Sequence, residues 1–214
     1  MSATELQRMA AANECLISIE AAEQILDYLG AMLAENRNVN LTAIREPSQG
    51  VLLHALDSIA IASEELGLRP PSACLDLGTG NGFPGVVVAC LFPDAEVTLM
   101  DRTLKKLKAI ERALVAAELA SDRIRTVQMD AAAAPAHGHK AAYDLVTARA
   151  VGDARSIGRL ARPMLRPGGS FVIWMSDEQR ETNKSPGAYQ APRYVEYELP
   201  PPVERWRTIA RFTR

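Results

Sequence analysis

The residues best suited to chemistry lie in one glycine-rich segment, residues 76–85, which reads DLGTGNGFPG. Glycines there let the backbone turn tightly, and they let a ligand approach where a side chain would collide. Gly80, Gly82 and Gly85 also satisfy the G-x-G-x-x-G pattern of dinucleotide-binding sites. That pattern is weak evidence alone, because a tight turn between a strand and a helix uses glycines too. The segment indicates a cofactor site, and the residues around the glycines indicate which cofactor it binds.

Asp76 and Pro84 favour S-adenosylmethionine over a dinucleotide as the ligand of this loop. The Asp76 carboxylate, two residues before Gly78, would oppose a pyrophosphate. It suits the ammonium or sulfonium end of S-adenosylmethionine, which has no phosphates. Pro84 removes a backbone N–H at the start of the next helix, where a phosphate site needs donors. We therefore expect S-adenosylmethionine, with NAD and a purely structural turn as the alternatives.

Two more carboxylates fall where predicted strands end. Asp101 closes a strand at 96–100 and lies 21 residues after Gly80, so it could accept hydrogen bonds from ribose hydroxyls. Both cofactors carry ribose, so Asp101 does not separate them. Asp130 follows a strand at 124–128, where we expect the adenine edge of the cofactor.

From about residue 72 onward, short apolar runs alternate with amphipathic segments. We predict strands at 73–77, 96–100, 124–128, 143–148 and 170–175, and helices at 84–92, 103–119 and 153–165. Such alternation forms βαβ units, so we expect a doubly wound, Rossmann-like α/β domain with a mostly parallel sheet. In the tail, strands at 193–199 and 206–212 are joined by a short proline link that suits antiparallel pairing. Residues 177–192 are expected to form a surface loop.

The first 50 residues predict a helical cap in front of this domain. Helical spacing of apolar residues over 5–36 predicts one or two amphipathic helices, which end near a polar cluster at 36–40. A connection at 44–50 then leads to a helix at 51–66, and Gly67 supplies its stop. We expect an N-terminal helical cap at 1–50 and a methyltransferase domain at 51–214.

The net charge and the cysteine content constrain the binding partners and the cellular compartment that we expect. A net charge of −2 gives no general affinity for nucleic acid, so any such contact needs a local basic patch. Cys15, Cys74 and Cys90 are far apart and have no C-x-x-C spacing, which fits a reducing cytoplasm without a zinc site or disulfides. We predict a cytoplasmic protein without a bound metal, a signal peptide or a membrane span.

Two sets of basic residues could contact RNA phosphates. One set lies on the helix after the second strand and comprises Arg102, Lys105, Lys106, Lys108 and Arg112. The other, spaced by four, three and four, comprises Arg155, Arg159, Arg162 and Arg166. We expect the second set to form one exposed helical stripe beside the carboxyl edge of the sheet. A solvated helix face is the alternative for both sets.

Several segments together carry a resemblance to a known family. They are NLTAIREP at 40–47, HALDS at 54–58, DLGTGNGFPG at 76–85, LMD at 99–101 with Lys105 and Lys106, TARA at 147–150 and RPGG at 166–169. They resemble the RsmG (GidB) family of small-subunit ribosomal RNA methyltransferases, which make 7-methylguanosine in 16S rRNA. The matches run from about residue 38 to 175, roughly two-thirds of the chain.

The resemblance implies a class I methyltransferase fold, S-adenosylmethionine as cofactor, and 16S rRNA or the small ribosomal subunit as partner. Carried over position by position, it implies cofactor contacts at Gly78, Phe83, Ala131, Ala132 and Arg149. Arg149 also ends the fourth predicted strand, at the edge where doubly wound sheets bind ligands. A surface salt bridge is the alternative for Arg149.

This sequence departs from the family pattern in three places. Leu53 stands where the family often has arginine, and Met175 where it has lysine after the fifth strand. The acidic pair after the third strand is reduced to alanines at 131–133, so cofactor contacts there would use the main chain.

Methylation of guanine at N7 uses an in-plane lone pair, so no proton must be removed and no general base is expected. We expect an in-line displacement in which positioning supplies most of the catalysis. Arg149, His54 and Asp57 are the candidate catalytic residues, and His54 and Asp57 share one face of a predicted helix. Asp57 could favour the cationic product. A hydrogen bond on the helix face, or a cap, is the alternative for this pair.

Other functions stay open at this point. They are an NAD-dependent oxidoreductase, a non-catalytic RNA-binding relative suggested by Leu53 and Met175, and a methyltransferase of small molecules. We expect a monomer, while the choice between naked rRNA and an assembled subunit is left open.

Overall fold

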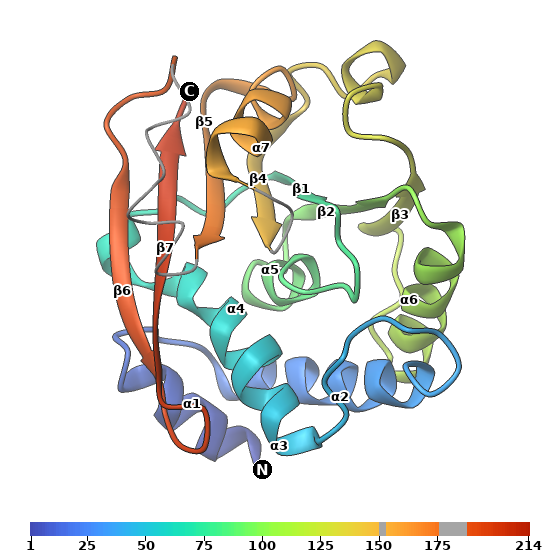
Figure 1. Ribbon diagram of the computed structural model, residues 1–214, viewed down its shortest axis with the longest axis vertical. Helices are drawn as coiled ribbons and strands as arrows, with labels where there is room; N and C mark the ends of the chain where they lie inside the picture. Colours follow the sequence, from blue (N-terminus) through green and yellow to red (C-terminus); the bar gives the residue numbers. More distant parts are fainter. Residues whose placement is uncertain (150–152, 176–187) are drawn as a thin grey trace.

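The computed structural model of the protein describes residues 1–149, 153–175 and 188–214. The centre of the described chain is one sheet with the strand order β3-β2-β1-β4-β5-β7-β6 (Figure 1). Its strands are β1 (Ala73–Leu77), β2 (Glu96–Asp101), β3 (Ile124–Gln128), β4 (Tyr143–Arg149), β5 (Leu165–Met175), β6 (Arg193–Leu199) and β7 (Arg205–Thr213).

The order of the strands defines where a ligand can bind. Strands β1 to β5 are parallel, whereas β7 runs antiparallel to β5 and β6. The chain moves outward from β1 to β2 and β3, then returns to β4 on the other side of β1. Doubly wound sheets bind ligands outside the carboxyl ends of the strands at such a reversal. The predicted doubly wound sheet with an antiparallel C-terminal pair is therefore confirmed.

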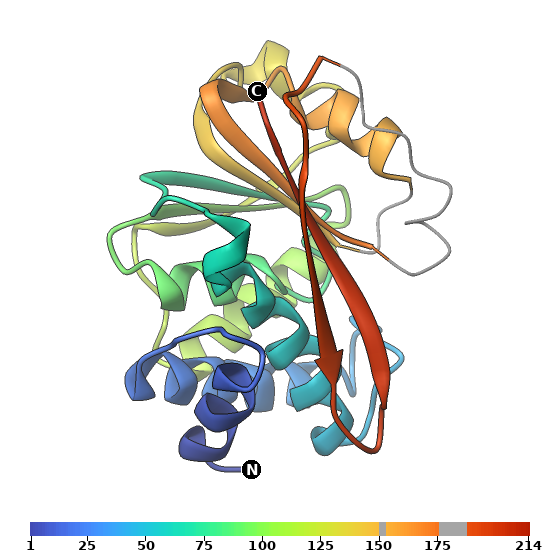
Figure 2. The same cartoon turned by 90° about the vertical axis from the view of Figure 1, so that its left-hand side faces the viewer.

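Helices cover both faces of this sheet (Figure 2). Helices α5 (Gly85–Leu91) and α6 (Leu104–Ala116) lie on one face, and α7 (Ala154–Ala161) lies on the other. Successive strand residues point to opposite faces, so Leu75 packs in the apolar cluster under α7 and Cys74 in the cluster under α5 and α6. Burial on both faces explains why the strands read as nearly continuous apolar runs.

The N-terminal segment forms two helices, α1 (Ala3–Ala11) and α2 (Ile19–Glu35). Each begins at a serine whose hydroxyl accepts a backbone N–H, and Ser2 forms a reciprocal capping box with Glu5. Helix α2 packs against α5 and α6, and its buried side chains belong to the same apolar cluster. The N-terminal helices thus form a further layer outside α5 and α6.

A continuous helical segment follows, which carries two of the predicted site residues. It consists of α3 (Pro47–Gly50), a π-helical turn η1 (Val51–Leu56), α4 (Asp57–Ile59) and a 3-10 turn η2 (Ala60–Ala62). It begins at Pro47, earlier than expected, because proline suits the first turn of a helix. The segment ends at Ala62, before the predicted helix end at 66, because Ser63 is not helical. A separate 3-10 turn, η3 (Glu64–Leu66), follows and is closed by Gly67 with φ +60°. The expected boundary at residue 50 falls inside this segment, and the division into cap and domain stays a prediction.

The expected stripe of four arginines on one helix is wrong. Helix α7 ends at Ala161, because Pro163 has no N–H to continue the helical hydrogen bonds, and β5 already begins at Leu165. Arg166 therefore lies on a strand, where it pairs with Asp144 at 2.9 Å near the amino end of β4. Arg162 donates to the Ala188 carbonyl at 3.0 Å. The exposed helical pair is reduced to Arg155 and Arg159.

The antiparallel hairpin β6–β7 reaches back to the N-terminal helices (Figures 1 and 2). The Asn13 side chain pairs with the main chain of Glu198 in both directions, at 3.1 and 3.0 Å. This brings β7 beside the helical segment 47–62. Of the predicted loop at 177–192, residues 177–187 lie outside the described chain, and Tyr189 donates to the Gly158 carbonyl at 2.8 Å.

The three cysteines are all buried and free. Burial raises the pKa of both Cys15 and Cys90 to about 12, so neither thiol is a nucleophile at neutral pH. Among the described residues, no helix combines the length and the apolar character that crossing a bilayer requires.

Candidate active site

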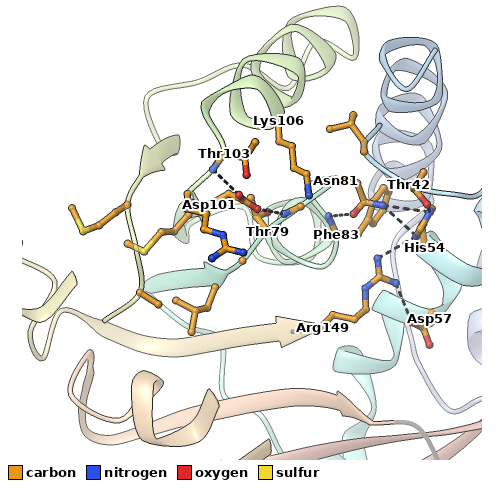
Figure 3. Close-up of a pocket in the computed structure, with 18 of the residues that line it drawn as sticks. Thr42, His54, Asp57, Thr79, Asn81, Phe83, Asp101, Thr103, Lys106 and Arg149 are labelled. Carbon is orange, nitrogen blue, oxygen red and sulfur yellow. Dashed lines mark hydrogen bonds and ion pairs between the residues drawn. The ribbon is translucent and has the colours of Figure 1, made fainter. Parts of the chain in front are cut away.

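A cavity of about 700 Å³ opens at the carboxyl ends of β1, β2 and β4, where the strand order reverses (Figure 3). Its wall comprises the glycine loop after β1, the ends of β2 and β4, the segment after β3 and the helical segment 47–62. The loop at 41–44 and Arg207 of β7 complete it. The two ends of the cavity differ in how they are built.

At the first end, backbone rather than side chain faces the cavity. Gly78 and Gly80 line it and have φ angles of +71° and +58°. A Cβ on Gly80 would approach only the Gly78 carbonyl oxygen, at 3.7 Å, so the space beside Gly80 belongs to the cavity. Gly85 differs, since a Cβ there would collide with Leu99 and Asp76 in the core. The positive φ and the open space at Gly80 fit a loop that lies directly against a ligand.

Asp101 connects this loop to the end of β2. Its Oδ2 accepts from the Gly80 N–H at 3.1 Å, and its Oδ1 accepts from the Thr103 N–H at 2.8 Å. Each carboxylate oxygen can accept a second hydrogen bond, and Asp101 lines the cavity. The donor and acceptor set at this end therefore fits the adjacent hydroxyls of a ribose.

The residues after β3 lie beside this carboxylate. Asp130 is exposed, lines the cavity and accepts from the Ala132 N–H at 2.9 Å. Ala131 also lines the cavity, whereas Ala132 does not. Of the expected cofactor contacts in this segment, two therefore face the cavity and one supports Asp130 from behind.

Asp76 lies beneath the glycine loop and outside the cavity wall. It is 1% exposed. Its oxygens accept from the Gly85 N–H at 3.1 Å and from the Thr147 hydroxyl at 2.8 Å. Burial raises the pKa of Asp76. Asp76 thus joins the start of α5 to β4 beneath the loop, and its expected pairing with the ammonium or sulfonium end stays a prediction.

At the second end, side chains from distant segments converge (Figure 3). Arg149, the last residue of β4, donates to the Leu53 carbonyl at 2.7 Å, to Asp57 Oδ2 at 3.0 Å and to His54 Nδ1 at 3.2 Å. His54 and Asp57 both line the cavity, on the shared face that their spacing predicts. Arg149 is therefore fixed against the helical segment by three bonds.

His54 is a neutral ring in this arrangement. Burial, and next to it the charge of Arg149, lower the pKa of His54 to about 3. Arginine can only donate, so Nδ1 accepts and the proton of the neutral ring is assigned to Nε2, 3.0 Å from the Thr42 hydroxyl. Phe83 stacks on the ring, with centroids 5.7 Å apart. Both ring nitrogens are engaged, so His54 is held in one orientation.

The Asp57 carboxylate accepts hydrogen bonds from more side chains than the sequence indicates. Besides Arg149, it accepts from Arg207 Nε at 3.1 Å and from the Tyr197 hydroxyl at 2.6 Å, both on Oδ1. The Trp174 indole donates to the Asp57 carbonyl at 2.6 Å. Two arginines therefore compensate the charge of Asp57, and the expectation that it stabilises a cationic product stays a prediction.

Among the polar residues of the cavity wall, sequence reasoning did not single out Thr42, Asn81 and Arg207. Thr42 and Asn81 fall inside the motifs quoted above, so the motifs carried a signal that was not used. Lys106 and Arg102 are the members of the first basic set that face the cavity, whereas Arg112 pairs with Glu35. Arg207 had no local signal, because it stands among several arginines on an ordinary strand.

Comparison with known proteins agrees with this architecture. A family model described as rRNA small subunit methyltransferase G (GidB) matches residues 21–205. Two curated proteins named ribosomal RNA small subunit methyltransferase G are similar to the chain. That of Leptothrix cholodnii is 38% identical over 163 residues, 74% of this chain and 71% of the relative. That of Symbiobacterium thermophilum is 34% identical over 185 residues, 80% of this chain and 73% of the relative.

Solved structures resemble the chain in fold. Cofactor-bound Rv0187 from MTB has a TM-score of 0.61 at 20% identity and covers 87% of this chain and 88% of its own. The tRNA (m1A58) methyltransferase TrmI from Aquifex aeolicus has a TM-score of 0.56 at 16% identity, with 74% and 68% covered. These identities are too low to carry more than the fold.

Proposed function

The chain belongs to the family of rRNA small subunit methyltransferase G, and we propose that its cavity transfers the methyl group of S-adenosylmethionine to N7 of a guanine in 16S rRNA and releases S-adenosylhomocysteine. The observation that carries the proposal is the single cavity with two unlike ends. One end is a glycine loop with a ribose-binding carboxylate, and the other is a side-chain platform around Arg149. A methyl transfer needs a donor and an acceptor in one enclosure, and this cavity provides it.

The glycine-loop end is the proposed cofactor half. S-adenosylmethionine supplies an electrophilic methyl group when it is bound there. In our proposal Asp101 accepts from the ribose, Asp130 faces the adenine edge, and Gly78, Gly80 and Ala131 offer their main chain. Asp76 and Ala132 support this half from outside the cavity wall, and Phe83 lies between the two halves against His54.

The Arg149 end is the proposed target half. Since guanine N7 offers an in-plane lone pair, this half has to orient the base and does not need to remove a proton. His54 fits that task, because it is neutral and both its nitrogens are engaged. Arg149 and the ring of His54 form a fixed platform, and Asp57 holds Arg149 in place. Catalysis then comes mainly from positioning.

The substrate in this proposal is rRNA, either free or within the small subunit, and the protein acts as a monomer. No feature of the described cavity favours NAD or a small-molecule acceptor over this assignment.

The direct test is to map 7-methylguanosine in 16S rRNA from cells with and without this protein. Purified protein, S-adenosylmethionine and either unmethylated 16S rRNA or unmethylated small subunits should restore the same modified position. Arg149→Ala serves as the control for contaminating activity. An rRNA that carries the same modifications in both cell lines, and no methyl transfer to either substrate, would reject the proposal.

A further inference from the structure

Arg207 stands at the Arg149 end of the cavity although its strand lies far away in sequence. It belongs to β7, lines the cavity, and its side chain is 18% exposed. The residue is thus partly buried within a site, and it is not one of the solvated arginines of the hairpin. No motif in the sequence marks it.

The charges at this end of the cavity do not balance. Asp57 lies between Arg149 at 3.0 Å and Arg207 at 3.1 Å, so two cations share one carboxylate. His54 is neutral, and the neighbouring wall residues Leu41, Thr42, Ile44 and Leu53 carry no charge. Counted over the residues that the structure describes, one positive charge therefore remains at this end, within a partly enclosed space where its field is weakly screened.

The excess charge is more available on Arg207 than on Arg149. Arg149 is held by three acceptors, namely Leu53, Asp57 and His54. The bond from Arg207 to Asp57 uses Nε, which is one of five N–H donors on a guanidinium. Burial opposes the charge of Arg207, but the Asp57 carboxylate and Tyr197 raise its pKa, so it stays a cation. Its fork geometry suits bidentate binding of a phosphate.

We propose that Arg207 binds a phosphate of the rRNA backbone beside the target guanine and so fixes the nucleotide over the cavity. The inference rests on the proposed rRNA substrate. A phosphate neutralises the uncompensated charge, which an uncharged base cannot do. Arg207 therefore acts on the position of the nucleotide, through its phosphate, and leaves the reacting atoms to the other residues.

The test separates the effect of the positive charge of Arg207 from the effect of its bond to Asp57 on the fold. We would measure kcat/KM for unmethylated small subunits at several salt concentrations, with S-adenosylmethionine affinity and thermal stability measured in parallel. Arg207→Gln should reduce the slope of log kcat/KM against log salt by about 0.7–0.9, the value for one phosphate contact. Arg207→Lys should keep the slope of the parent, and the affinity for S-adenosylmethionine should stay within about twofold in both.

Two control variants show whether the charge of Arg207, rather than its bond to Asp57, sets the slope. Tyr197→Phe removes another bond to Asp57 without a change of charge, so its slope should equal that of the parent. Arg166→Gln removes a positive charge at the amino edge of the sheet, away from the cavity, and should also leave the slope unchanged. If Arg207→Gln does not fold because Asp57 loses a partner, the paired variant Asp57→Asn with Arg207→Gln removes one charge of each sign, so the net charge of this end stays that of the parent while the Arg207 guanidinium is lost. A lowered slope in this variant again assigns the phosphate contact to Arg207, and a parental slope would overturn the inference.

An unchanged slope in the folded Arg207→Gln protein would overturn the inference. So would a loss of S-adenosylmethionine affinity with the parental slope, because Arg207 would then only support Asp57 and Arg149. A parent protein that methylates neither subunits nor rRNA would instead reject the proposed function, which is a separate outcome.

Discussion

The two ends of the cavity show two ways of building a binding surface. At the glycine-loop end, residues 78–80 and Asp101 come from two neighbouring βα turns, and the loop N–H of Gly80 meets Asp101 directly. At the other end, His54, Arg149 and Arg207 come from three segments separated by 95 and 58 residues, and they meet around Asp57. The first end is formed mainly by the backbone of one loop, and the second by side chains from distant segments.

This difference predicts how each end responds to change. The backbone of the glycine loop cannot move aside easily, so a single added side chain should block cofactor binding. The side-chain network shares its bonds among several partners, so removal of one partner should shift stability or substrate binding by a smaller amount. The following experiments test that contrast, beginning with the largest expected effect.

Gly80→Val should abolish detectable binding of S-adenosylmethionine. Its φ of +58° is costly for a β-branched residue, by about 1–3 kcal/mol, and the added methyls would occupy cavity space. We expect at least a 100-fold loss of affinity by calorimetry, on the order of 3 kcal/mol. Gly138→Val is the matched control, since Gly138 has φ +91° in an exposed turn with open space around it. Equal affinity in folded Gly80→Val protein would contradict the role of this loop.

Asp101→Ala should weaken S-adenosylmethionine binding by about 1.5–3 kcal/mol, or roughly 10- to 150-fold. The reason is the loss of a charged acceptor for the ribose, together with the bond that holds Gly80. Asp101→Asn keeps one acceptor oxygen and should fall between parent and Ala. A dissociation constant that does not change in Asp101→Ala would show that the ribose is held elsewhere.

His54 should make the protein less stable in acid. Its pKa is about 3 when folded and about 6.5 when unfolded, so between these values the unfolded chain binds the extra proton. Stability is therefore complete above pH 6.5 and falls as the pH is lowered toward 3. At pH 5 the loss should be about 2 kcal/mol relative to pH 7.

Urea unfolding at both pH values measures this loss. His54→Gln should remove that part of the pH dependence, whereas replacement of the exposed His137 by Gln should keep it. If the parent and His54→Gln lose the same stability between pH 7 and 5, His54 is not the buried neutral ring described above.

Arg155 and Arg159 should give the smallest effect, because both are exposed on α7. Neutralising both should leave S-adenosylmethionine affinity intact and lower the salt slope of RNA binding by about 0.7–0.9 for each phosphate that is contacted. Arg166→Ala should not change the slope, since Arg166 pairs with Asp144 at the other edge. If log affinity falls with log salt at the same slope in the double variant and the parent, α7 does not contact RNA phosphates.

The sequence predicts the glycine-loop end well because its signals are local. Strand periodicity, the spacing of the glycines and the position of Asp101 all lie within about one βαβ unit. Residue types cannot show whether a carboxylate lies in the cavity wall, as Asp101 does, or beneath the loop, as Asp76 does. The end of α7 could have been predicted, because Pro163 is visible in the sequence.

The side-chain end could be predicted only in part. The motif around His54 and Asp57 pointed to both residues, and the strand-end position pointed to Arg149. Tyr197 and Arg207 could not be found, because their roles depend on the hairpin folding across α4, and tertiary contacts of this kind leave no local pattern. The pairing of Asp57 with both arginines could not be predicted for the same reason.

The insertion of β7 between β5 and β6 has a consequence for the order of assembly. Among the described strands β6 pairs only with β7, so residues 193–199 have no partner in the sheet until residues 205–213 are in place. Until then the outer edge of β5 and the whole of β6 are open to wrong pairing. The glycine loop can form from earlier, nearby strands, whereas Arg207 arrives with β7. The cofactor end of the cavity can therefore form before β7 adds Arg207 to the other end.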